Sequence, residues 1–491
     1  MAAKKLKILI VAAEVAPFAK VGGLADVAGA LPKALRAMGH DVRVAMPCYK
    51  MIEDNPAYNV KDVPLEFTFQ LNNEYTEQAY IRQTLIGEDI PVYLVAHKTF
   101  FKEATESKKV YSLQPEPYVF FDRAVMEFVS RLTPQWIPDI VHCNDWHTGL
   151  LPVYLSMESD KNPMWANTAR IFTIHNLAYQ GEFDWQILSC AGLPESLFTY
   201  DKLEFYGQVS FMKGGLIFSH LVNTVSQTYS KEIQTPEYGC RLEGLLQYLA
   251  KQDKLFGIVN GIDYSEYDPA TDPRIPANFS ADSPAGKSKC RTALQKECGL
   301  PLSKTSAVIG IVSRLADQKG FDLISHIAEK MMNLPLQLVI LGAGDPVYET
   351  FFRDLEKRFP KKIKAHIGFD ADLAQRIYAG SDMFLMPSRF EPCGLGQLMS
   401  LRYGTIPIVR ATGGLADTII PFDHKTHRGN GFSFVDYKAD TLLETIELAL
   451  RTFADKEQWQ LLVQNAMNSN FSWDNSARKY VELYKNALKR I

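Results

Sequence analysis

Residues 6–47 read LKILIVAAEVAPFAKVGGLADVAGALPKALRAMGHDVRVAMP. The apolar run at residues 8–13 predicts a buried strand, and apolar residues at helical spacing between Ala25 and Gly39 predict a helix. Gly39 stands where helices commonly end in a left-handed residue, whereas Pro32 predicts a kink inside the helix. Residues 40–47 predict a second strand. The stretch is therefore a βαβ unit, which predicts a parallel sheet covered by helices.

Short apolar strands continue to alternate with helices along the chain. Further strands are predicted at residues 91–97, 139–144, 170–176 and 221–226, and a second series of strands and helices follows between residues 307 and 411. A stretch rich in Pro, Asp and Ser at residues 259–284 separates the two series. Residues 474–491 predict one amphipathic helix, which must dock on a domain to bury its apolar face.

We therefore predict an α/β protein with two Rossmann-like, doubly wound parallel-sheet domains that face a central cleft. The first is expected at residues 1–255, completed by a C-terminal helix at residues 472–491, and the second at residues 256–471. The pentapeptide GGLAD occurs at residues 22–26 and again at residues 413–417, each time between a strand and a helix. Two glycine-rich turns at strand ends suit a ligand-binding cleft, and turn chemistry alone is the alternative explanation.

The composition of the 491 residues excludes several classes of protein. With 46% hydrophobic and 22% charged residues, the chain is globular rather than disordered, and its net charge of −3 gives no broad attraction to nucleic acid or anionic membranes. No apolar window approaches the ~20 residues of a membrane helix. Seven cysteines without a CxxC pair indicate reduced thiols. We expect a cytoplasmic protein, or a plastid protein if a transit peptide has been removed.

Two loops that follow predicted strands combine cations with glycine. Lys20 precedes Gly22 and Gly23, and the segment at residues 313–320 carries Arg314 and Lys319 before a glycine and a helix. Bare backbone amides at a helix start, with cations beside them, suit a phosphate or another anion. Ordinary solvated charges beside tight turns are the alternative for both loops.

A third loop, SRFEPCGLGQ at residues 388–397, also joins a strand to a helix. Glu391 followed by Pro and two glycines suits a cradle of backbone amides with one fixed acceptor, although acids at helix starts are common as caps. Cys393 as a nucleophile has no evident partnered base. Asp370 and Asp372 form a DxD pair of the kind that holds divalent metal ions in some sugar transferases, but capping of the next helix is the favoured interpretation.

In the first domain, HCNDWH at residues 142–147 and TIHN at residues 173–176 place compact polar groups at strand ends. Metal binding by His142, Cys143 and His147 is one interpretation. Strand alternation sends neighbouring side chains to opposite faces, however, and no second ligand cluster accompanies them. We therefore predict a site without metal.

Taken together, KVGGLADV, HCNDWHTG, TIHNLAYQG, VNGID, SRLADQKG and SRFEPCGLGQ resemble the motifs of the bacterial glycogen synthases and plant starch synthases. The resemblance runs from the first predicted strand to the last helix. It implies a retaining glucosyltransferase of the GT-B fold that transfers glucose from ADP-glucose to the non-reducing 4-hydroxyl of an α-1,4-glucan and releases ADP. It also implies no cofactor and no metal, and the expected partners are ADP-glucose or ADP and the glucan, with no nucleic acid and no membrane.

The resemblance implies roles for individual residues. The diphosphate would be held by Lys20, Arg314 and Lys319, whose charges replace Mg²⁺. Glu391 would contact the transferred glucose, and His175 and Asp145 would line the glucose from the other side. Phe369 would stack on adenine, and the acceptor glucan would pack on aromatic rings. The predicted catalytic residues are His175, Glu391, Arg314, Lys319 and Asp145, and the predicted substrate-binding residues are Lys20, Gly22, Gly23, Glu14, Asn260, Phe369, Cys393, Gly394, Leu395, Gly396, Tyr93, Trp146 and Tyr179.

Three departures from the family pattern leave the donor open. Gly396 replaces a Thr of several bacterial relatives, Phe369 replaces the commoner Tyr, and Met399 stands where the wider GT-B group often has a second glutamate. UDP-glucose as donor is therefore an alternative to ADP-glucose. A phosphorolytic enzyme would need a lysine-bound pyridoxal phosphate, for which no motif is present. A non-catalytic sugar-binding protein that closes like a clamshell is the remaining class, and it gives no reason for three converging cations.

Overall fold

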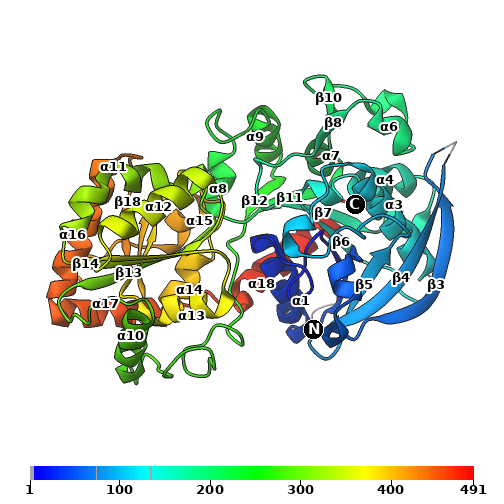
Figure 1. The fold of residues 1–491 in the computed structure, drawn as a ribbon. Helices are drawn as coiled ribbons and strands as arrows, with labels where there is room; N and C mark the ends of the chain where they lie inside the picture. The colour runs from blue at the N-terminus through cyan, green and yellow to red at the C-terminus, as the bar shows by residue number, and fades with distance from the viewer. Residues whose placement is uncertain (1–4, 73–74, 133–134) are drawn as a thin grey trace. The chain divides into compact units, whose positions relative to one another are not determined.

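The computed structural model describes residues 5–72, 75–132 and 135–491. The chain divides into two compact units, each with its own largely parallel sheet and hydrophobic core (Figure 1). Unit 1 comprises Met1–Asn260 and Trp473–Ile491, and unit 2 comprises Gly261–Ser472. Each unit is an α/β domain with helices on both faces of its sheet, which agrees with the predicted fold class.

Unit 1 contains a nine-stranded sheet. Its strands run parallel from β12 to β5, and the edge strands β4 and β3 continue the sheet in antiparallel pairing. Parallel pairing aligns the ends of the central strands, because Val11 of β1 pairs with Cys143 of β6, and Asn144 pairs with Thr173 of β7. In sheet order the strands are β12 (Leu255–Gly257), β11 (Leu221–Thr224), β7 (Ala169–Ile174), β6 (Ile140–Asn144), β1 (Lys7–Val11), β2 (Asp41–Pro47), β5 (Ile90–Ala96), β4 (Thr76–Ile86) and β3 (Lys61–Gln70).

The helices of unit 1 form two layers on its sheet. Helices α1 and α18 pack against each other, and α4 packs against both α3 and α7. Pro32 lies inside α1, which runs continuously through it. A small antiparallel sheet of β8 (Glu182–Asp184), β9 (Glu204–Phe205) and β10 (Gln208–Ser210) adds to the unit. The helices are α1 (Gly23–Ala37), α2 (Lys50–Glu53), α3 (Glu116–Arg131), α4 (Leu151–Ser159), α5 (Pro163–Ala166), α6 (Ile187–Cys190), α7 (Phe211–Phe218), α8 (Gln227–Glu232), α9 (Glu243–Lys251) and α18 (Trp473–Leu488).

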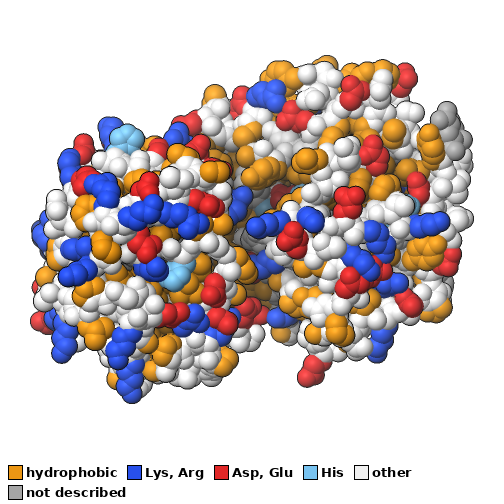
Figure 2. Space-filling view, in the orientation of Figure 1, with side chains coloured by type: hydrophobic (Ala, Val, Ile, Leu, Met, Phe, Trp, Pro, Cys, Tyr) orange, Lys and Arg blue, Asp and Glu red, His pale blue; other side chains and the backbone are white. Residues whose placement is uncertain are grey.

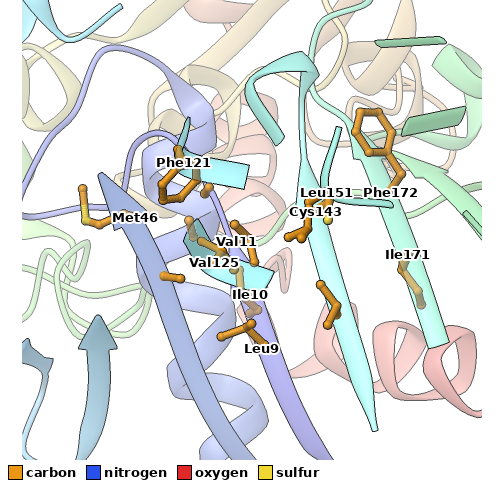
Figure 3. Packing of buried hydrophobic residues seen from close by; sticks show 14 of the residues in the cluster. Leu9, Ile10, Val11, Met46, Phe121, Val125, Cys143, Leu151, Ile171 and Phe172 are labelled. Carbon is orange, nitrogen blue, oxygen red and sulfur yellow. The ribbon is translucent and has the colours of Figure 1, made fainter. Parts of the chain in front are cut away.

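The core of unit 1 forms because the central strands are apolar on both faces. Figure 3 shows Ile10 and Val11 of β1 in one cluster with Phe121 and Val125 of α3. At roughly 25 cal/mol per Å² of buried apolar surface, packing of this kind is the main stabilising term of the domain. It leaves the loops after the strands as the places where polar side chains can gather.

Helix α18, red in Figure 1, joins unit 1 although it lies at the end of the chain. It packs against α1 and β7 with its apolar face, as the amphipathic pattern predicts. Two buried phenols also reach the strands: Tyr484 Oη lies 2.9 Å from His142 Nδ1, and Tyr480 Oη accepts a hydrogen bond from Asn223 Nδ2 at 3.1 Å. The other ring nitrogen of His142 lies 2.7 Å from Thr173 Oγ1. The helix therefore supports the ends of β6, β7 and β11.

Unit 2 contains a six-stranded, fully parallel sheet. In sheet order its strands are β15 (Ile363–Ile367), β14 (Leu336–Gly342), β13 (Ala307–Val312), β16 (Met383–Met386), β17 (Ile406–Arg410) and β18 (Phe432–Phe434). Helices α11, α12 and α16 pack along one face, and α10, α13 and α14 along the other. The helices are α10 (Ala285–Glu297), α11 (Phe321–Met332), α12 (Pro346–Arg358), α13 (Ala371–Gly380), α14 (Gly396–Arg402), α15 (Gly413–Thr418), α16 (Ala439–Ala454) and α17 (Lys456–Asn468).

The boundary between the units lies at Asn260 and Gly261, a few residues later than residue 255. The reason is β12, whose residues Leu255–Gly257 pair with β11 and extend the sheet of unit 1. The second crossing lies between Ser472 and Trp473, where α18 begins. Strand pairing thus decides the boundary, and a stretch rich in Pro and Asp marks it only approximately.

The face of each unit that Figure 2 shows mixes charges of both signs with hydrophobic side chains. This mixture agrees with the small net charge of −3. Within the described parts of the chain, no helix has the length and apolar character needed to cross a membrane.

We predict that Tyr484→Phe destabilises the protein. The substitution removes only the hydroxyl that lies against His142 Nδ1, and a buried polar atom without a partner costs about 1–3 kcal/mol. Urea denaturation followed by circular dichroism should show a lower midpoint with an unchanged slope. Tyr248→Phe, at an exposed tyrosine of the same unit, serves as the control and should leave the midpoint unchanged. Equal midpoints for Tyr484→Phe and wild type would show that the contact between Tyr484 and His142 does not stabilise the protein.

Candidate active site

The loops after β13 and β16 bring a cation and a carboxylate together at the carboxyl edge of the unit 2 sheet. Lys319 Nζ lies 2.6 Å from Glu391 Oε2, and Ser388 Oγ donates to the same oxygen at 3.1 Å. Glu391 is buried and Lys319 is largely covered, so solvent screens this ion pair only weakly. Two contacts hold the loops in register: Arg389 N–H donates to Gln318 O at 2.8 Å, and Gln318 Nε2 donates to Phe390 O at 3.2 Å.

Close backbone approach explains the glycines around this pair. A Cβ at Gly413 would lie 2.0 Å from Glu391 O, and one at Gly320 would lie 2.0 Å from Pro387 O. Both residues also have positive φ, +45° and +76°. The N–H of Gly414 donates to Glu391 O at 3.2 Å and to Pro392 O at 3.1 Å. The second GGLAD turn therefore fixes the segment that carries Glu391.

The residues after Glu391 turn sharply into α14. Gly394 has φ of +72°, and Gln397 Nε2 donates to Cys393 O at 3.1 Å and to Gly394 O at 2.9 Å. Because a trans peptide points its N–H away from its C=O, the N–H groups of Gly394 and Leu395 face away from Gln397. Among the residues that the structure describes, these two N–H groups have no hydrogen-bond partner. Cys393 is a buried free thiol.

Arg314 and Phe369 lie at the same edge of the unit 2 sheet and are exposed. Arg314 follows β13, and Phe369 follows β15 after Gly368. The ring of Phe369 is 93% exposed, so both of its faces are open to a planar ligand. Asp370, the next residue, caps α13 by accepting from Leu373 N–H at 2.8 Å, which confirms the capping interpretation of the DxD pair.

In unit 1 the loop after β1 folds around a buried carboxylate, Glu14. Its Oε2 accepts from the N–H of Gly22 at 3.0 Å and also from the N–H of Val21, and its side chain is hydrogen-bonded to Tyr111. Burial raises the pKa of Glu14, and the two amide donors oppose that rise. Lys20 is part-exposed and pairs with Asp26 at 2.6 Å. Glu14 therefore occupies the N–H groups of Val21 and Gly22 in the first glycine-rich turn.

Asp145 follows β6 in an uncommon backbone conformation, with φ of +57°. A residue other than glycine is held there only when its surroundings compel it, and such strain is found at functional sites. Its Oδ1 accepts from His175 N–H at 2.7 Å, and its carboxylate also accepts from the N–H of Asn176. Burial, with a smaller contribution from Glu14, raises the pKa of Asp145 to about 7. Asp145 thus fixes the backbone of the loop that carries His175.

His175 is the first residue after β7, and its ring is buried. Its Nε2 lies 2.9 Å from Asn144 Oδ1, and burial lowers the pKa of His175 to about 3. The ring is therefore neutral at physiological pH. The carboxyl edge of the unit 1 sheet brings together Glu14, Lys20, Gly22, Gly23, Asp145, Trp146, His175 and Tyr179.

The three predicted acceptor aromatics lie in different settings. Tyr179 is 54% exposed and Trp146 is half-buried, with its ring stacked on His147 at 4.0 Å between centroids. Tyr93 is only 6% exposed, because it lies in the middle of β5 with its ring against Phe128 and its hydroxyl bound by Arg43. Tyr93 is thus a core residue. A sugar could pack on its ring only if the ring left the core.

Asn260 is buried at the end of unit 1, and its Oδ1 has no partner among the described residues.

The histidines of the HCNDWH motif have structural surroundings: His142 lies between Tyr484 and Thr173, and His147 stacks on Tyr111 and Trp146. No group of three His, Cys, Asp or Glu side chains suited to a metal ion occurs in the described chain.

Two residues that contact the predicted site residues Glu14 and His175 were not predicted from the sequence. Tyr111 reaches Glu14 from a long loop without any recognisable motif, and no pattern in the sequence could have identified it. Asn144 lies inside the HCNDWH motif, between two residues whose roles were considered. Its position as the last residue of a predicted strand was the signal that could have identified it.

Comparison with known proteins gives matches over the whole chain. Residues 7–248 match the starch synthase catalytic domain model, and residues 297–466 match the model of glycosyl transferases group 1. Glycogen synthase of Desulforudis audaxviator is 49% identical over 99% of this chain and 98% of its own length. Glycogen synthase of Thermotoga maritima is 46% identical over 99% of this chain and 100% of its own length.

Solved structures of such enzymes are also similar to this chain. The catalytic domain of starch synthase IV from Arabidopsis thaliana, bound to ADP and acarbose, has a TM-score of 0.91 and 34% identity over 99% of this chain and 100% of its own. Sucrose-phosphate synthase from Thermosynechococcus elongatus, at 14% identity and a TM-score of 0.59, shares the fold alone. The chain therefore belongs to the family of bacterial glycogen synthases and plant starch synthases, which are glycosyltransferases of the GT-B fold.

Proposed function

We propose that this protein transfers glucose from ADP-glucose to the non-reducing 4-hydroxyl of an α-1,4-glucan, with retention of the anomeric configuration and release of ADP. The observation that carries the proposal is the pair of Lys319 and Glu391, 2.6 Å apart at one sheet edge. A departing diphosphate needs a cation, and a transferred sugar needs a fixed acceptor for its hydroxyls. The relatives named glycogen synthase and the starch synthase solved with ADP and acarbose support this choice of donor and acceptor.

Unit 2 binds the nucleotide part of the donor in this proposal. Arg314 and Lys319 offset the negative charge that grows on the diphosphate as the bond to glucose breaks. The unpartnered N–H groups of Gly394 and Leu395 add donors without charge. Phe369 offers an open ring face to adenine. Phe369 lacks the phenolic hydroxyl that a tyrosine would supply there, so UDP-glucose is the alternative donor.

Unit 1 contributes groups for the sugar. Asp145 positions the backbone of His175, and Lys20 in the first glycine-rich turn is a cation suited to an anionic group of the donor. Tyr179 and the half-buried Trp146 offer ring surface to the glucan. The expected cytoplasmic location stays part of this proposal, as does the absence of any cofactor.

The reaction proceeds by attack on the same face from which the diphosphate leaves. The bond between glucose C1 and the phosphate oxygen breaks, the bond between C1 and the acceptor O4 forms, and the acceptor proton moves to the departing phosphate. Glu391 is fixed by Lys319 and Ser388 and does not become bonded to the sugar. A double displacement would instead require a carboxylate that attacks C1 from the opposite face.

The direct test of this function is ADP release by the purified protein. ADP-glucose with glycogen should give continuous ADP release, and UDP-glucose with glycogen should give a much slower release of UDP. Comparable rates with the two donors would make the donor preference wrong. ADP release at the same rate without glycogen would make the acceptor wrong.

We predict that Lys319→Ala and Arg314→Ala each lower turnover by about 10²-fold or more, the scale for the loss of one preorganised charge at a transition state. The KM for glycogen should change little, because neither residue is assigned to the acceptor. Lys362→Ala is a matched control, since this part-buried lysine of the same unit donates to Leu334 O at 2.7 Å away from the assigned residues. Wild-type turnover in Lys319→Ala or Arg314→Ala would remove that residue from the site.

We predict that Glu391→Gln loses most of its turnover while its affinity for ADP does not fall. Glutamine keeps the shape and can accept from Ser388 and Lys319, but it carries no negative charge. Isothermal titration measures ADP affinity separately from turnover. Denaturing mass spectrometry of the wild type after incubation with ADP-glucose should show no added hexose. A stable glucosyl adduct on Glu391 would overturn the same-face mechanism.

We predict that Asp145→Asn is less active but more stable than the wild type above about pH 7. Because burial raises the pKa of Asp145 from 3.8 to about 7, the folded state binds its proton more tightly than the unfolded chain does. The free energy of unfolding therefore falls as the pH rises from 3.8 to about 7. Asparagine does not titrate, so the variant does not show this fall. Urea midpoints of both proteins across the range measure the difference, with the exposed Asp184→Asn as control. If the urea midpoints of wild type and Asp145→Asn change with pH in the same way, the raised pKa of Asp145 is wrong.

A further inference from the structure

Asn144, which has no role in the mechanism above, lies buried at the end of β6 between β1 and His175. Its Nδ2 donates to Val11 O at 3.1 Å and to His142 O at 3.2 Å. Its Oδ1 lies 2.9 Å from His175 Nε2. Its backbone is also held, since Asn144 N–H donates to Thr148 Oγ1 at 2.7 Å.

These contacts determine which way the amide of Asn144 points. Both of the carbonyl groups beside Nδ2 can only accept hydrogen bonds. If the amide were rotated by half a turn, its oxygen would face two carbonyl oxygens in a buried setting, which is strongly unfavourable. The NH₂ group must therefore face Val11 and His142, and Oδ1 must face His175.

The orientation of Asn144 in turn determines the proton position on His175. An amide oxygen only accepts, so His175 Nε2 must carry a hydrogen and donate it. With Nε2 protonated and the ring neutral, Nδ1 is left as a lone pair. No described residue is hydrogen-bonded to that nitrogen. His175 can thus accept a hydrogen bond from a ligand through Nδ1 but cannot donate one.

We propose that Asn144 is a positioning residue that holds His175 as its neutral Nε2–H form, so that Nδ1 accepts a hydrogen bond from a hydroxyl group of the sugar. This inference deepens the proposed glucosyl transfer and rests on it. Sugar hydroxyls are donors, and a lone pair at a fixed place orients one of them. A neutral ring also adds no positive charge beside a sugar carbon that becomes positive as the diphosphate leaves.

The ionisable groups that face His175 are consistent with this state. His142, on the neighbouring β6, is buried and has its pKa lowered to about 3 by burial, so it adds no charge. Asp145 is engaged with the backbone N–H of His175 rather than with its ring. Glu14 acts on Asp145 and is itself bound by two amides and Tyr111. Asn144, by contrast, is hydrogen-bonded to the imidazole itself.

The first experiment is nuclear magnetic resonance of the full chain labelled with ¹⁵N-histidine, with His175 assigned by comparison with His175→Gln. We expect His175 to remain neutral from about pH 6 to about pH 8, with a proton on Nε2 and none on Nδ1. A proton on Nδ1 in the wild type would overturn the proposal whatever the activity of the protein. This readout does not depend on glucosyl transfer, so it separates the proposal from the function on which it rests.

The second experiment uses Asn144→Asp, which replaces the amide by a carboxyl group of the same shape. Its second oxygen takes the place of Nδ2 and faces the carbonyls of Val11 and His142, so folding of the variant is measured first by circular dichroism. A carboxylate beside Nε2–H favours the doubly protonated ring, so the pKa of His175 should rise by about 4 units or more, from about 3 to about 7 or above. His175 would then donate from Nδ1, and turnover at neutral pH should fall at least about tenfold and recover partly as the pH rises. The buried Asn223→Asp, on the neighbouring β11, is the matched control and should leave the His175 resonances unchanged.

The outcomes are distinct. Loss of the neutral Nε2–H form together with a shifted pH profile in Asn144→Asp supports the proposal. A wild-type pH profile and wild-type turnover in a folded Asn144→Asp would overturn it. If Asn144→Asp does not fold, the proton positions in the wild type decide the matter alone.

Discussion

Parallel strands deliver the residues that follow them to one edge of a sheet, and almost every residue assigned to the reaction depends on this constraint. In unit 2, Arg314, Lys319 and Glu391 belong to loops that follow β13 and β16, which are paired neighbours. In unit 1, Asp145 and His175 follow β6 and β7, which are also paired. The apolar pairing of strands therefore creates the polar site at their ends. Tyr93 lies in the middle of a strand and is correspondingly part of the core.

Backbone groups and side-chain amides then orient the charged residues. In each copy of the GGLAD pentapeptide one glycine N–H donates to a glutamate, although the glycine and the acceptor atom differ. Gly22 donates to the carboxylate of Glu14, and Gly414 donates to the carbonyl of Glu391. Asn144 orients His175 in a comparable way, and Gln397 holds the carbonyls beside Glu391. The groups that we propose to touch substrate thus depend on neighbours that we do not assign to it.

Much of this arrangement could be predicted from the sequence. The first βαβ unit, the second series of strands and the docked last helix follow from hydrophobic periodicity, which long buried elements display clearly. The antiparallel strands β3 and β4 were missed, because β3 contains Pro64 and its burial pattern is largely exposed. The small sheet of β8, β9 and β10 has strands of only two or three residues, too short for any period. Tyr111 was missed because its contact with Glu14 depends on the path of a long loop.

The measurement that tests the central claim most directly is proton nuclear magnetic resonance of the product formed from ADP-glucose and a short α-1,4-linked acceptor. The account predicts new anomeric signals of α-1,4 linkages, one for each ADP released, with growth at the non-reducing end. This one spectrum tests the donor, the acceptor, the linkage and the retention of configuration together. New β-linkages, or free glucose in place of a longer chain, would contradict the account.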